Sequence, residues 1–226
     1  MNDFTRGFSF ISKDKLDMSM GLTNLSAQKV VNDLSELHLK LIIKILGEEK
    51  DARIIANKID NYRRKKKIET SKELASIINS AKKNYNNYKK NSATKTFQAI
   101  RIFVNQELTE LIKGLISSAK ILSNDGIIII VSFHSLEDRI AKSFFNIYSN
   151  SKKNPSRYLP SNEKNLSFFK YVSKKPLFPE KQEIEQNIRS RSAKLRHGIR
   201  NKNSFFYPEE FKNKFSNFFK LESALL

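Results

Sequence analysis

The feature that most constrains the fold is a run of five consecutive β-branched residues, 127–131. The turn-forming residues 124–126 precede it, and Ser135 can cap a helix after it, with two acidic residues in the first helical turn. A run that is apolar on both faces predicts a central strand covered by helices on both sides. A long apolar stripe before the turn predicts a helix over residues 95–121. Together these signals predict an α/β fold with a partly parallel sheet.

Residues 26–82 carry the signals of a compact all-helical unit. Ser26 and Ser35 can each accept a backbone N–H at the start of a helix. A third helix keeps an apolar stripe at helical spacing, and a fourth opens with a capping box formed by Thr70 and Glu73. The expected helices cover residues 26–34, 35–46, 48–67 and 70–82.

The rest of the chain supplies fewer elements. Residues 83–93 are polar and rich in Asn and Lys, which predicts a hinge or loop. Another polar stretch covers 149–165, and residues 166–172 and 194–199 can each form a further strand. The tail from residue 208 is rich in Phe, and we expect it to be helical.

The chain is strongly basic, with a formal net charge of +19. The excess is concentrated in two regions: residues 50–95 carry 14 basic and 4 acidic side chains, and residues 151–226 carry 17 and 7. Residues 96–150 balance at 5 and 5, so a uniform bias toward Lys codons does not explain the pattern. The distribution predicts contact with a polyanion such as RNA or DNA, with a merely solvated surface as the alternative.

Several classes of protein are excluded by composition. No apolar stretch is long enough to span a membrane, so we expect no membrane association. The chain has no cysteine, which rules out disulfides and fits a cytoplasmic location. Its three histidines lie far apart in the sequence, and we expect no metal site.

The densest group of functional residue types is Ser-Phe-His-Ser-Leu-Glu-Asp-Arg at 132–139, where the predicted strand passes into a helix. Ligands of open α/β sheets bind outside the carboxyl ends of the strands, so this position favours chemistry. The alternative is structural: Ser135, Glu137 and Asp138 cap the helix, while His134 makes a structural hydrogen bond.

Three basic segments are candidates for phosphate contact. Arg63 and Arg64 begin a run of five cations, which a solvated helix end explains as well. Strand-like alternation would place Arg189 and Arg191 on one side of a strand, where they could hold phosphates. A basic edge strand that resists aggregation is the alternative.

The N-terminal segment joins a cation to aromatic residues. Arg6 could clamp a phosphate and Phe8 could stack on a base, although phenylalanines also anchor loops to a core.

Several strings of this chain, taken together, resemble one family, the ribosomal RNA small subunit methyltransferase H family, also called MraW. They follow one another in that family's order and at its spacing over nearly the whole chain. The strings are RGFSF…LDMSM (6–20), GEEKDARIIANKI (47–59), SKELA (71–75), ATKTFQAIRIFVNQEL (93–108), SFHSLEDRIAK (132–142) and RSRSAKLR (189–196).

The resemblance implies methyl transfer from S-adenosylmethionine to the exocyclic 4-amino group of a cytidine in the decoding region of 16S rRNA. It implies an α/β fold, a partial class I (Rossmann-like) methyltransferase domain with an all-helical insertion domain. Residues 1–95 would be the helical insertion that recognises RNA, and residues 96–226 would be the later part of the Rossmann-like domain. The implied partner is 16S rRNA or the small ribosomal subunit.

The chain departs from the family at the cofactor site. Family members begin with a region that carries a Gly-rich loop, a ribose-binding acid and a DLGxSS-type segment. We expect this chain to lack that region, because none of its six glycines forms a G-x-G. No cofactor-binding residue can therefore be carried over, and the missing half could be a separate chain. The alternatives are a catalytically inactive RNA-binding fragment, half of a split enzyme, or a structural helical protein.

The residues expected to act are assigned as follows. His134 and Glu137 are the candidate catalytic residues, which would orient the base or relay its proton. The candidates for holding RNA are Arg6, Phe8, Arg63, Arg64, Arg139, Arg189 and Arg191.

Overall fold

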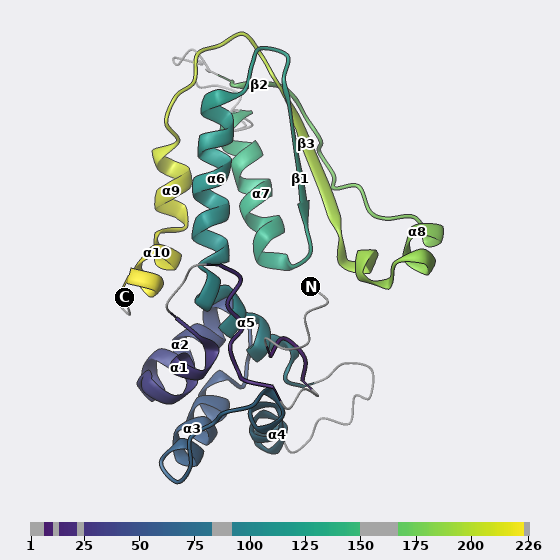
Figure 1. Cartoon of the computed structure of the whole chain (residues 1–226). Helices are drawn as coiled ribbons and strands as arrows, with labels where there is room; N and C mark the ends of the chain where they lie inside the picture. The colour runs from purple at the N-terminus through teal and green to yellow at the C-terminus, as the bar shows by residue number, and fades with distance from the viewer. Residues whose placement is uncertain (1–6, 11–13, 22–24, 83–91, 150–166, 224–226) are drawn as a thin grey trace, which may run out of the picture. The chain divides into compact units, whose positions relative to one another are not determined.

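The computed structural model describes residues 7–10, 14–21, 25–82, 92–149 and 167–223 (Figure 1). The chain divides into two compact units, Met1–Glu107 with Lys220–Leu226, and Leu108–Phe219. Among the described residues, no helix is both long enough and apolar enough to cross a membrane.

The first unit is helical. Three of the predicted caps are confirmed: the side chains of Ser26, Ser35 and Thr70 accept the backbone N–H groups of Lys29, His38 and Glu73. Glu73 completes the predicted capping box. The helices are α1 (Ala27–Asp33), α2 (Glu36–Leu46), α3 (Ala52–Arg63), α4 (Ser71–Ala81) and α5 (Thr94–Asn105).

The core of the first unit lies where α2 packs against α3 and α5. The predicted stripe of α3 is buried there, with Ile55 and Ile59 fully inaccessible to solvent. Opposite them, Leu39, Ile42 and Ile43 of α2 are also fully buried. A buried ion pair between Lys82 and Glu49, with 2.5 Å between Nζ and Oε2, joins the end of α4 to the segment before α3. The predicted loop at 83–93 lies largely outside the described residues.

The single helix predicted over 95–121 is wrong. Two helices occur, α5 and α6 (Glu107–Ile121), because Gln106 between them adopts a left-handed conformation with φ 51° and ψ 34°. Arg101 holds the break by donating to both carboxylate oxygens of Glu107, at 2.8 and 2.9 Å. The Asn105 amide fixes the same corner, since it donates to the Met18 carbonyl at 2.8 Å.

The second unit contains the sheet. Its strands are β1 (Ile127–Ser132), β2 (Phe169–Val172) and β3 (Lys194–Arg200), in the order β1-β3-β2. Both ladders are antiparallel, so the expected partly parallel sheet is not found among the described strands. The remaining elements are α7 (Ser135–Tyr148), α8 (Lys181–Gln186), the 3₁₀ helix η2 (Ile188–Ser192), α9 (Glu209–Lys214) and α10 (Ser216–Ser223). The predicted strands and the helical tail are thus confirmed.

One face of the sheet packs on α7, and its core is aromatic (Figure 1). Phe144 lies edge-on to Tyr148, Phe169 and Phe211, with ring centroids 5.0 to 5.9 Å apart. Gly198 of β3 faces this cluster: a Cβ there would lie 2.7 Å from the Phe145 ring. Only glycine therefore lets α7 approach β3 this closely.

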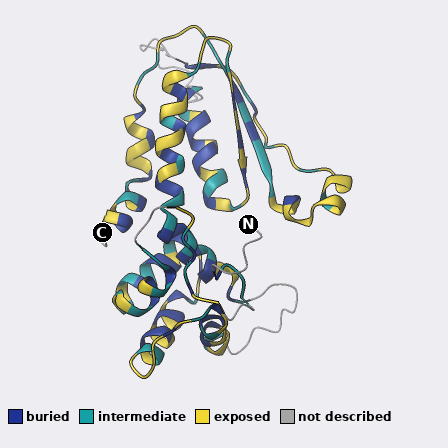
Figure 2. Cartoon of the chain, viewed as in Figure 1, coloured by how far each residue is buried: buried dark blue, intermediate teal, exposed yellow. Residues whose placement is uncertain are grey.

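The opposite face of β1 is uncovered, contrary to the expectation of helices on both sides (Figure 2). Burial alternates along the strand: Ile127, Ile129 and Val131 are 56%, 62% and 50% exposed, whereas Ile128 and Ile130 are 8% exposed. Among the described strands, β1 pairs only with β3, so its other edge is open. An open edge beside an apolar face is a surface prone to association.

This arrangement predicts opposite effects for two neighbouring substitutions. Ile129→Lys should reduce self-association and leave the melting temperature nearly unchanged, because its side chain is already in solvent. Ile130→Lys should lower the free energy of unfolding by about 3 kcal/mol or more, because an unpaired charge would enter the core. Light scattering and thermal melts measure the two effects. Equal destabilisation by both substitutions would contradict the exposure of Ile129 and would show that its side chain is buried.

Candidate functional site

The turn between β1 and α7 is built by the side chains of His134 and Glu137. His134 is the N-cap of α7, and its Nδ1 accepts the backbone N–H of Glu137 at 3.4 Å. In return, Glu137 Oε2 accepts the N–H groups of Phe133 at 2.7 Å and His134 at 3.3 Å. The expectation that Ser135 caps this helix is wrong, because Ser135 is already its first helical residue. The two candidate catalytic residues thus form a capping box.

The electrostatics of this pair favour an ionised carboxylate. Burial acts to raise the pKa of Glu137, but the adjacent His134 side chain and the hydrogen bonds from the Phe133 and His134 backbone outweigh it and lower that pKa below its usual value. His134 Nε2 is buried and lies 3.3 Å from Glu137 Oε1, at ion-pair distance but without hydrogen-bond geometry. Because Nδ1 accepts the hydrogen bond from the backbone N–H, Nε2 is the ring nitrogen that faces the Glu137 carboxylate.

Asp138 joins α7 to β3. Its Oδ1 accepts from Arg196 Nε at 2.7 Å, and its Oδ2 accepts from Lys194 Nζ at 3.2 Å. Burial again acts to raise the pKa of Asp138, but the bonds from the two cations outweigh it and lower the pKa. No local pattern in the sequence signals this network, because it links a helix residue to a strand residue 58 positions away.

Three of the cations predicted to hold RNA, Arg139, Arg189 and Arg191, belong to this unit. Arg139 is exposed on α7, beside Asp138. Arg189 and Arg191 are exposed, but they lie in η2 and not on a strand, so the predicted alternation is wrong. The Asn187 side chain caps the Arg189 backbone N–H at 3.2 Å and turns the chain before β3 begins.

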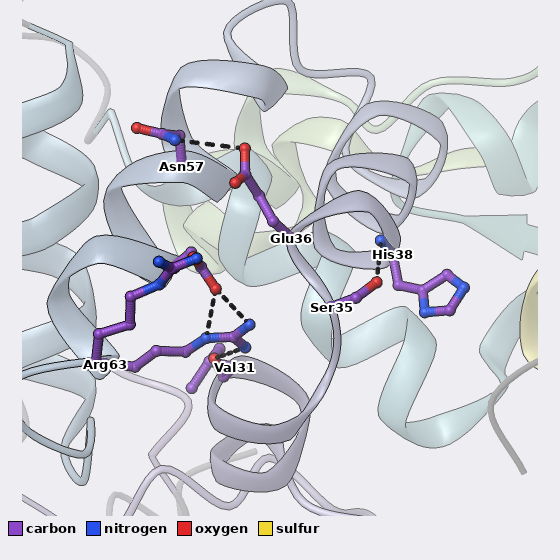
Figure 3. Close-up of polar contacts among 8 residues, drawn as sticks. Val31, Ser35, Glu36, His38, Asn57 and Arg63 are labelled. Atoms are coloured by element: carbon purple, nitrogen blue, oxygen red, sulfur yellow. Dashed lines mark hydrogen bonds and ion pairs between the residues drawn. The ribbon is translucent and has the colours of Figure 1, made fainter.

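In the first unit, Arg63 and Arg64 have different environments. Figure 3 shows the Arg63 side chain beside Val31. Arg63 is 13% exposed, donates to Asp60 through two nitrogens and reaches the Val31 carbonyl at 2.9 Å. Arg64 is 73% exposed and meets Asp60 from the outer side. Burial acts to raise the pKa of Asp60, but the two guanidinium groups lower it below its usual value. Arg63 is therefore a structural residue, and Arg64 remains accessible.

Of the two N-terminal candidates for RNA contact, the structure describes Phe8. Arg6 lies outside the described residues. Phe8 is half-buried, next to Gly7 with φ 75°. The Gly7 carbonyl accepts the Ser71 hydroxyl at 2.7 Å, which ties this segment to the start of α4.

Comparison with known proteins identifies the family. The model of the MraW methylase family matches residues 1–200 of the 226. The chain belongs to the MraW methylase family. It is 47% identical over 197 residues to a protein of Sulfurihydrogenibium sp., covering 86% of this chain and 62% of the relative. The matches in Ehrlichia canis and Rickettsia prowazekii are 46% and 42% identical over 87% and 84% of this chain, and 64% and 63% of those relatives.

Each of these MraW relatives is named ribosomal RNA small subunit methyltransferase H. The chain spans 62–64% of their length. A Rossmann-like methyltransferase fold goes with this family, so the predicted fold class is confirmed.

The glycines of this MraW chain do not fit S-adenosylmethionine, the methyl donor that a methyltransferase family implies. A cofactor loop needs glycines whose missing side chains leave room for the ligand. Here a Cβ on Gly7 would lie 2.4 Å from the Lys15 carbonyl, and one on Gly47 would lie 2.7 Å from two carbonyls. Gly126 and Gly198 are crowded by Leu122 and Phe145. The two uncrowded glycines are Gly21, which is exposed, and Gly114, inside α6. The described residues therefore hold no cradle for the cofactor.

The capping box predicts a pH-dependent contribution to stability. Because the folded pKa of Glu137 is lowered, its charge stabilises the fold above the unfolded pKa of about 4.3, and this contribution is lost as the pH falls through the folded pKa. Glu137→Ala should cost about 1 kcal/mol at neutral pH. Glu137→Gln keeps an acceptor oxygen, so only the charge-dependent part of the side chain's contribution to stability should be lost. In urea unfolding, the difference in free energy of unfolding between wild type and Glu137→Gln should shrink as the pH falls from 7 to 3. A difference that does not change with pH would contradict the role of the charge.

Arg63, the last residue of α3, and Arg64, its C-cap, predict separable effects on RNA binding and stability. Arg64→Gln should reduce the slope of log K against log salt by about 0.7 to 0.9 if Arg64 neutralises one phosphate. Arg63→Gln should leave the slope unchanged and lower the free energy of unfolding by about 1–3 kcal/mol, because Asp60 and the Val31 carbonyl lose a donor. Fluorescence anisotropy measures the salt slope of RNA binding, and urea unfolding measures the free energy of unfolding. A slope unchanged in Arg64→Gln would assign that residue to the solvated surface.

Proposed function

We propose that this chain is the RNA-contacting and base-orienting part of an enzyme that transfers a methyl group from S-adenosylmethionine to the exocyclic 4-amino group of a cytidine in 16S rRNA. The family match over residues 1–200 carries the proposal, together with the name that the relatives share. The net charge of +19 supports a polyanionic substrate. A reaction on the small ribosomal subunit takes place in the cytoplasm.

The position of the His134–Glu137 pair supports a role at the reacting base. The pair lies directly after the carboxyl end of β1, where α/β proteins place their ligands. The amine of cytosine is a weak nucleophile because its lone pair is delocalised into the ring. A group that holds the amine in line therefore contributes strongly to the rate.

Of the two roles that the sequence left open, orientation fits the geometry better than proton removal. A carboxylate with a lowered pKa is a poor base at neutral pH, so Glu137 is suited to staying ionised. Its negative charge and its backbone bonds fix the imidazole ring of His134. The two side chains therefore act as one unit at the turn after β1, with His134 Nε2 facing the Glu137 carboxylate.

We propose that the cofactor is held by polypeptide outside these residues, in the same protein or in a separate chain. The absence of a glycine cradle among the described residues supports this. The exposed apolar side chains of Ile127, Ile129 and Val131 support it too, because further polypeptide packed on this face would remove them from water. The same observations leave a second candidate, a catalytically inactive RNA-binding fragment or half of a split enzyme.

Calorimetry with S-adenosylmethionine tests the proposal. The 226-residue chain should release no measurable heat. The same chain joined to the part of the relatives that it does not match should bind the cofactor. Failure of the joined protein to bind, despite a cooperative thermal melt, would favour the inactive RNA-binding fragment. Micromolar binding by the 226-residue chain alone would contradict the proposed location of the cofactor site.

Two substitutions of His134 separate its catalytic role from its capping role in that joined protein. Asparagine is a good N-cap, so His134→Asn should keep the melting temperature but lower kcat by about a hundredfold, because Nε2 is lost. His134→Ala should lower kcat and also cost about 1 kcal/mol of stability. Steady-state methylation of small-subunit rRNA and thermal melts give both values. An active His134→Asn enzyme would make His134 a cap only.

A further inference from the structure

The second unit contains a pocket away from the His134–Glu137 site. It lies between the last two turns of α7 and the β2–β3 ladder, has a volume of about 520 Å³ and is lined by thirteen residues. This volume falls within the range of small-molecule and nucleotide sites, about 300–1,000 Å³. We call it the α7–β2 pocket. His134 lies at the other end of α7, which has 14 residues and so extends for about 21 Å.

The lining of the α7–β2 pocket carries charge of one sign. Four of the thirteen residues are cations, Lys142, Lys170, Lys174 and Arg196, and none is acidic. Arg196 is paired with Asp138, and Lys170 is paired with Asp125. Within the described part of the chain, neither Lys142 nor Lys174 forms an ion pair, and both are exposed. Two unpaired cations at one pocket create a positive potential that attracts an anion.

The neutral lining residues suit a phosphate attached to a base. Ser149, Ser167, Ser173 and Asn146 provide hydroxyl and amide groups of the kind that contact phosphate and sugar. Tyr171 is 51% exposed; the His197 ring packs on one side of it, with 5.4 Å between ring centroids, and its exposed side offers a surface on which a base can stack.

The end of α7 works against anion binding, but only weakly. A helix C-terminus carries roughly half an elementary negative charge. Lys142 and Lys174 each carry a full positive charge, and together they outweigh that fraction. The local field therefore remains positive.

We propose that the α7–β2 pocket binds a backbone phosphate of single-stranded RNA through Lys142 and Lys174, with the neighbouring base on Tyr171. The identity of the RNA as 16S rRNA rests on the proposed function, but the chemistry of the pocket does not. The pocket gives the chain an RNA contact along the C-terminal half of α7, whereas His134 lies at its N-terminus. A strand held there is anchored while a distant base reaches the turn after β1.

Binding of a fluorescein-labelled single-stranded RNA to the 226-residue chain tests this inference, with anisotropy measured over a series of salt concentrations. Replacing Lys142 and Lys174 together by glutamine should reduce the slope of log K against log salt by about 0.7 to 1.4. The matched control replaces Lys175 and Lys212, which are exposed and do not line the pocket, and should change the slope much less. Tyr171→Leu should weaken binding about tenfold without changing the slope.

Three results would overturn the inference. Equal slopes in the two double variants, with equal melting temperatures, would mean a diffuse basic surface. Competition by millimolar inorganic phosphate or by a mononucleotide as strong as that by unlabelled RNA would mean a site for free phosphate. An unchanged affinity in Tyr171→Leu would remove the base contact. Because the labelled RNA need not come from 16S rRNA, and no methyl transfer is measured, these outcomes are independent of the proposed function.

Discussion

The short connection from β1 to α7 fixes the second unit. Only Phe133 and His134 separate the strand from the helix, and the capping box of His134 and Glu137 sets the direction in which α7 leaves. One turn further on, Asp138 binds Arg196 and Lys194 and holds the helix on β3. Toward the other end, Gly198 lets the Phe145 ring lie against the same strand. Three local constraints therefore place α7 along its whole length.

This placement gives the two ends of α7 different chemistry. At the N-terminal end an ionised carboxylate fixes an imidazole directly after a strand, an arrangement suited to orienting a base. At the C-terminal end cations and hydroxyl groups surround a pocket, an arrangement suited to a phosphate. One rigid helix would then fix the distance between an anchored strand and a reacting base. The exposed alternate residues of β1 indicate that this sheet is suited to packing against further polypeptide.

Local patterns in the sequence predicted local structure well. The caps at Ser26, Ser35 and Thr70 depend on side chains within three residues of the bond they make, so spacing was sufficient. The break at Gln106 was missed because its causes, Asn105 and the Met18 carbonyl, meet across 87 positions. The prediction that helices cover both faces of β1 was wrong for a similar reason. Hydrophobicity indicates which residues can be buried, but not which part of the chain covers them. For the site, the sequence located the 132–139 segment but not the contact of Asp138 with β3.

The most direct measurement of the central claim is the position of the methyl group. Small-subunit rRNA would be incubated with labelled S-adenosylmethionine and either the 226-residue chain or that chain joined to the segment the relatives carry, and the product nucleosides would be identified by mass spectrometry. The account predicts label on the 4-amino group of a single cytidine with the joined protein and none with the 226-residue chain alone. Label on a different atom, or methyl transfer by the 226-residue chain by itself, would contradict it.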